Sequence, residues 1–163
     1  MRTLKLSIDT LTVELGNGYD SSFTSYEKTI AETGSVEYSL YGTALEEGSL
    51  YEPKYVWTIG VYLSLTQWQN LQVIYQRCER KRRTQASYNI VLEDFISPYV
   101  EDVTSRTRAL ATGASVTTIG SVAISYPAQF NVRLFEPKAI EGNNRNFKYL
   151  VTFVLKELDT VTA

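Results

Sequence analysis

The chain has 163 residues and a formal net charge of −2, with 44% hydrophobic and 21% charged residues, which suits one globular domain. It has no histidine and one cysteine, Cys78, so an intramolecular disulfide, a cysteine-based metal site and all Ser-His or Cys-His nucleophiles are excluded. The start of the chain alternates and carries charges, unlike a signal peptide, and no apolar run reaches the ~20 residues of a membrane helix. We therefore expect a protein made in a cytoplasm that is not an enzyme, with no cofactor, metal site or membrane partner.

Strand patterns dominate the first 64 residues. Apolar residues alternate over 4–8, and the phase changes at Asp9–Thr10, which predicts a bend, bulge or tight turn there. Further strands are predicted at 23–30, 35–42 and 54–64, with a loop at 43–53. Gly60 inside the last of these indicates a bulge or a close backbone approach.

One helix is predicted, over about 66–83. Thr66 followed by Gln69 fits a capping box, in which two side chains satisfy free backbone N–H groups. Its apolar stripe at helical spacing consists of Trp68, Leu71, Ile74, Tyr75 and Cys78. We expect this stripe, with Cys78 as a small core residue, to cover one face or edge of the sheet.

Strands resume after the helix. They are predicted at 87–95, 128–136 and 147–158, with a hairpin around Ile119–Gly120. A long polar connection precedes that hairpin, and such connections usually carry function or hide structure of their own. The sequence therefore predicts a mainly β single domain over 1–163. We expect a β-sandwich or barrel of about eight or nine strands, one flanking helix, and a long loop or hairpin arm at about 98–121.

Neighbouring carboxylates occur three times and suggest no catalytic pair. Adjacent residues on a strand point to opposite faces, whereas glycosidase chemistry needs two carboxylates across a cleft. We therefore predict solvated charges at Glu46–Glu47, Glu93–Asp94 and Glu101–Asp102.

Charge is unevenly distributed along the chain. Residues 1–53 hold three cations and nine acids, whereas residues 54–92 hold six cations and one acid. A helix end favours one or two cations but does not explain five. Three interpretations stay open for these cations: an acidic protein partner, a solvated helix end, or nucleic acid, which the acidic chain disfavours. The candidate subunit-interface residues are Arg77, Arg80, Lys81, Arg82, Arg83, Arg106, Arg108, Glu46 and Glu47.

The segment 54–95 carries a family resemblance. The strand "YVWTIGVYL" leads into "LTQWQNLQVIYQR" and then into "NIVLEDF", and this order resembles small tail proteins of tailed bacteriophages: tail tube, tube initiator and distal tail proteins. The stretch "SRTRALATGASVTTIGSVAISYPAQFNVRLFEP" also resembles virion proteins from phages of cyanobacteria.

The resemblance implies a structural virion protein of the tail, made in the host cytoplasm. Such a protein would form a ring, commonly a hexamer, around a channel through which DNA passes, and would contact tube, hub, sheath or tape-measure proteins. It also implies an arm that reaches a neighbouring ring, matched by position to 98–121. The alternative is a monomeric β-sandwich adaptor that binds carbohydrate or protein. A third interpretation is a small hydrolase that uses Asp or Glu.

Overall fold

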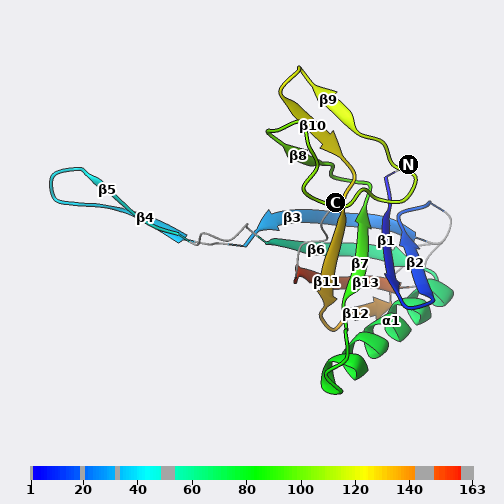
Figure 1. The fold of residues 1–163 in the computed structure, drawn as a ribbon. Helices are drawn as coiled ribbons and strands as arrows, with labels where there is room; N and C mark the ends of the chain where they lie inside the picture. Colours follow the sequence, from blue (N-terminus) through cyan, green and yellow to red (C-terminus); the bar gives the residue numbers. More distant parts are fainter. Residues whose placement is uncertain (1, 19–20, 32–33, 49–53, 142–148, 159–163) are drawn as a thin grey trace.

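The computed structural model describes residues 2–18, 21–31, 34–48, 54–141 and 149–158, and in that part of the chain it is mainly β with one helix (Figure 1). The elements are β1 (Leu4–Ile8), β2 (Leu11–Leu15), β3 (Ser21–Ile30), β4 (Gly34–Tyr38), β5 (Ala44–Gly48), β6 (Tyr55–Leu63), α1 (Leu65–Arg83), β7 (Ile90–Asp94), β8 (Tyr99–Glu101), β9 (Thr117–Ile119), β10 (Ala123–Tyr126), β11 (Gln129–Leu134), β12 (Lys138–Glu141) and β13 (Tyr149–Glu157).

The main sheet has eight strands and forms the sandwich. Its order is β2-β1-β7-β11-β13-β6-β3, and β12 pairs with β13. In Figure 1 the strands β3, β6 and β13 run across β1, β2, β7 and β11, so the two parts of the sheet face each other at a steep angle. Alternate residues of β1, β11 and β13 are buried, and the pattern of β11 puts Phe130, Val132 and Leu134 into one core. The predicted β-sandwich with one helix is confirmed.

Two predicted irregularities in the strands are confirmed. Asp9 and Thr10 form the tight turn between β1 and β2, and Asp9 adopts a left-handed backbone with φ of 52°. Gly60 lies opposite the register shift of β3. A Cβ there would come within 2.7 Å of the hydroxyl oxygens of Thr24 and Ser25, so these two side chains occupy the space that the bare backbone of Gly60 leaves open.

The helix α1 closes one end of the sandwich. It begins at Leu65, and its N-cap is Ser64, whose hydroxyl accepts a hydrogen bond from the backbone N–H of Gln67 at 3.4 Å. The predicted cap at Thr66 is therefore wrong by two residues, because Ser64 and Gln67 offer the same spacing one half-turn earlier. Leu71, Ile74 and Cys78 are the buried residues of α1, which packs on β1, β2, β6, β11 and β13.

A three-stranded sheet closes the opposite end (Figure 1). Its order is β8-β10-β9, and it incorporates the segment 98–121 that was expected to be a long loop or hairpin arm. The β9–β10 hairpin does extend from the sandwich, but the loop between β8 and β9 packs inward and buries Arg108 and Ala111. The long connection is therefore anchored to the body at Arg108 and Ala111, while most of its residues are exposed.

The element that projects furthest is β4–β5. These strands pair with each other in register from Gly34↔Gly48 to Tyr38↔Ala44, and with no other strand of the described residues. The expectation of a loop at 43–53 is wrong where the structure describes it, because β5 is a strand. In the chain the hairpin lies between β3 and β6, and the last described contact of the β3–β6 pair is a 2.7 Å hydrogen bond from Ala31 N to the Lys54 carbonyl. Figure 1 shows it extending away from the sandwich and from α1.

Candidate interaction surface on the helix

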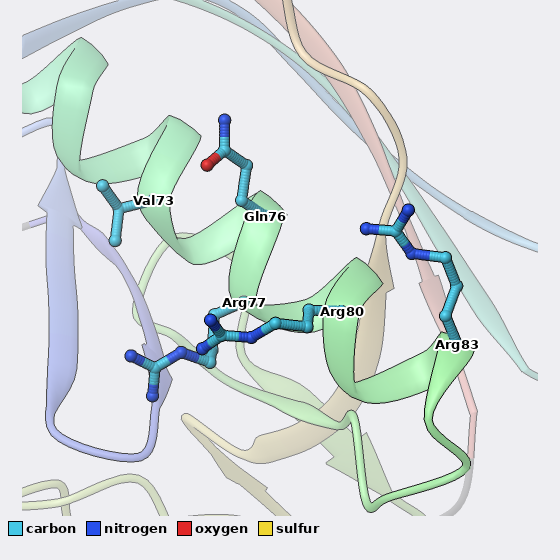
Figure 2. A pocket seen from close by; sticks show the side chains of 5 residues that line it. All are labelled: Val73, Gln76, Arg77, Arg80 and Arg83. Carbon is cyan, nitrogen blue, oxygen red and sulfur yellow. The ribbon is translucent and has the colours of Figure 1, made fainter.

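The outer face of α1 carries a shallow groove of about 450 Å³. We call its lining the outer stripe of α1: Val73, Gln76, Arg77, Arg80 and Arg83 (Figure 2). These residues recur at three and four positions, so they project from successive turns on the side opposite the core. Val73 is 46% exposed, which gives the stripe an apolar patch beside its arginines.

Two of the five helix cations that were predicted to face a neighbouring subunit pair with an acid of the same chain. Asp9, at the β1–β2 turn, accepts hydrogen bonds from Arg77 at 3.0 Å and from Lys81 at 2.5 Å. These contacts, first Lys81 and then Arg77, lower the pKa of Asp9 below its ordinary value. Arg77 and Lys81 therefore fix the position of α1 over the first hairpin.

A third cation is also paired. Arg82 forms an ion pair with Glu79 at 2.7 Å, and Arg133 of β11 reaches the same carboxylate at 3.4 Å. The hydrogen bond from Arg82 is the largest cause that lowers the pKa of Glu79. Within the described part of the chain, Arg80 and Arg83 form no ion pair, and both are exposed. Arg83 donates only to the Glu79 carbonyl, at 3.3 Å.

The structure reveals a second group of charges that sequence reasoning missed, buried between the main sheet and the β8-β10-β9 sheet. We call Lys28, Asp94, Arg108 and Glu157 the buried charge cluster. Asp94 is fully buried and accepts hydrogen bonds from the Tyr26 hydroxyl at 2.5 Å and the Trp57 indole at 3.1 Å. Lys28 lies 3.9 Å from Asp94 and 4.6 Å above the Tyr55 ring, and burial lowers the pKa of its amine.

Arg108 is the largest correction to the predicted interface. Its side chain is fully buried and forms an ion pair with Glu157, which also accepts from the Tyr55 N–H at 2.9 Å. The guanidinium lies 4.9 Å from the Tyr99 ring centre and 5.0 Å from that of Phe130. In the monomer the Arg108 side chain is therefore not exposed for an interface, and it holds the loop after β8 onto the core.

The prediction of solvated carboxylate pairs is wrong for three of the six residues. Glu93, Asp94 and Glu101 are all buried. Glu93 accepts from the backbone and hydroxyl of Thr112 at 3.1 and 2.7 Å. Burial would raise the pKa of Glu101, but hydrogen bonds from Thr107 and Tyr126 outweigh it and lower that pKa. Glu93 and Glu101 therefore tie the loop 102–116 to the ends of β7 and β8, whereas Asp94 bonds within the sandwich.

The other candidates are distributed over the molecule. Arg106 is exposed in the loop after β8, and Glu46 and Glu47 lie in β5 opposite Val36 and Ser35. Cys78 is buried as predicted; burial raises the pKa of its thiol, which donates to the Tyr88 carbonyl at 3.2 Å. The structure therefore brings together the helix cations and places the β5 acids on a separate projection.

Comparison of the chain with protein-family models, curated proteins and solved structures finds no match. Within the described residues there is no group of three potential metal ligands among His, Cys, Asp and Glu. No helix in the described ranges is long and apolar enough to span a membrane.

Proposed function

We propose that the chain is a structural protein of a phage tail that assembles with copies of itself into a ring around the DNA channel, as a tube, tube-initiator or distal-tail component. The observation that carries the proposal is the β4–β5 hairpin. An isolated two-stranded hairpin is marginally stable in water. This one pairs with no other strand of the described chain, so a partner that packs against it would stabilise it.

The turn of the hairpin supports the same proposal. Leu40 and Tyr41 are 103% and 97% exposed, so two large side chains gain nothing from folding of the monomer. Burial of such side chains stabilises an assembly by about 1.5–3 kcal/mol each. Exposed apolar side chains of this kind support a role in assembly. The resemblance of 54–95 to phage tail proteins supports a phage tail as that assembly.

The proposal is tested by light scattering and negative-stain microscopy over a range of concentrations. We expect closed rings, or stacks of rings, whose mass is a multiple of 18.5 kDa. A strict monomer at the highest soluble concentration would contradict the proposal. If that monomer bound a glycan array or a second protein, it would instead favour the alternative, a β-sandwich adaptor.

A further inference from the structure

We propose that the β4–β5 hairpin of one copy docks along the outer stripe of α1 of a second copy. The inference rests on the proposed self-assembly and names the two surfaces that meet. The partner is a second copy of this chain, recognised by opposite charge and by a small apolar contact.

The charges of the two surfaces are complementary. The hairpin residues 34–48 contain three acids, Glu37, Glu46 and Glu47, and no cation. The helix residues 65–83 contain five cations and one acid. Since Asp9 and Glu79 already pair with three of those cations, Arg80 and Arg83 are the two that can receive an external acid. Complementary charge of this kind sets the partner and the register of an interface.

The dimensions of the two surfaces also agree. Val73 and Arg80 are seven residues apart on α1, which is about 10 Å along the axis at 1.5 Å per residue. On the hairpin, β5 begins at Ala44 and Glu47 follows three residues later, which is about 10 Å at 3.4 Å per residue. A hairpin laid along α1 with its turn at Val73 therefore brings its acidic strand to the arginines at the helix end. Leu40 and Tyr41 would then cover the exposed Val73.

The geometry requires two copies. Figure 1 shows the hairpin pointing away from α1, so the two surfaces lie at different ends of one molecule. Each copy then offers a hairpin to one neighbour and a helix to another. Such a head-to-tail contact closes into a ring when the rotation between copies divides a full turn, and otherwise gives an open fibre.

Two charge reversals test the contact. The first variant, Arg80→Glu with Arg83→Glu, makes the stripe acidic, and the second, Glu46→Lys with Glu47→Lys, makes the hairpin basic. Each alone places like charges together, so we expect the concentration for half-assembly to rise at least tenfold. An equimolar mixture of the two variants restores both opposite-charge contacts in an alternating order, and we expect it to assemble within about threefold of the wild-type concentration.

The outcomes separate the possible failures. A matched control reverses two exposed cations elsewhere, Arg2→Glu with Lys138→Glu, and we expect it to assemble like the wild type. Circular dichroism confirms that each variant is folded. If the wild type assembles and the two reversals assemble equally well, or if the mixture is not rescued, the docking inference is wrong and the proposed function stands. A wild type that stays monomeric overturns both.

Discussion

The outer stripe of α1 and the buried charge cluster use the same residue types in opposite surroundings. Arg80 lies in water at the end of a helix, whereas Arg108 is fully buried beside Glu157 and three aromatic rings. A buried arginine is tolerated only with a partner, and removal of either member leaves an uncompensated charge. A basic residue is therefore available for binding only where the fold leaves it unpaired.

The largest effect is expected in the buried cluster. Arg108→Met leaves the Glu157 carboxylate buried without its ion-pair partner, and we expect the free energy of unfolding to fall by about 3–5 kcal/mol. Urea denaturation measures the loss. The double variant with Glu157→Leu removes both charges and should be more stable than the single one. A single variant within 1 kcal/mol of the wild type would show that the pair does not fix the loop after β8.

A smaller effect is expected at Glu101, which holds the same loop through hydrogen bonds. Glu101→Gln removes charged-acceptor bonds to Thr107 and Tyr126, and we expect a loss of about 1.5–3 kcal/mol at pH 7. Because the folded-state pKa of Glu101 lies below its ordinary value of 4.5, the stabilisation is present above that value and is lost as pH falls through the folded pKa.

Urea denaturation from pH 7 to pH 3 separates the contributions of charge and shape at this position. The difference in stability between the wild type and the glutamine variant should narrow as the pH falls below 4.5. If the free energies of unfolding of the two proteins differ by the same amount from pH 7 to pH 3, the charge of Glu101 is not the source of its stabilisation.

A still smaller effect is expected where α1 meets the first hairpin. Asp9→Asn keeps a residue type that tolerates the left-handed backbone, but it weakens the contacts to Arg77 and Lys81. We expect a modest loss of stability that shrinks in high salt, since these groups are partly exposed. Asp102→Asn, in an exposed loop residue, is the matched control. A loss that is equal at low and high salt would point to the backbone turn instead of the ion pairs.

The smallest effect on folding is expected at the outer stripe itself. Arg80→Gln should leave the free energy of unfolding within about 0.5 kcal/mol of the wild type, because the side chain is exposed. The same chemical denaturation used for Arg108→Met gives the comparison directly. A decrease in the free energy of unfolding above 1 kcal/mol would show that Arg80 stabilises the monomer. Arg80 would then not be an unpaired member of the outer stripe of α1.

Much of the fold was predictable because it follows from periodicity. Alternation identified the strands around Asp9–Thr10 and Gly60, and helical spacing identified the buried face of α1 with Cys78. The start of α1 was misassigned because two Ser/Thr residues offer the same capping distance to a glutamine. The strand β5 was missed because its sequence, ALEEG, has no β-branched residue.

The surface was less predictable than the fold. Arg106 and Arg108 are two residues apart, yet one is exposed and the other is in the core. The difference in exposure between Arg106 and Arg108 depends on Glu157, which is distant in sequence and meets Arg108 because β13 is part of the folded sheet. The sequence likewise did not show that Arg77 and Lys81 pair with Asp9, because packing sets the angle between α1 and the β1–β2 hairpin. The run of cations therefore predicted where the outer stripe of α1 lies, but not which of its cations form no ion pair within the chain.

The continuity of the hairpin with the sandwich has a mechanical consequence. β4 follows β3 and β5 precedes β6, and β6 is hydrogen-bonded on both sides, to β3 and to β13. A pull on the turn at Leu40–Tyr41 would load β3 and β6 in the same direction along their axes, so the hydrogen bonds between β6 and β13 would resist together in shear instead of opening one at a time. Tension on the hairpin would thus be carried into the main sheet through β6 and its partner β13.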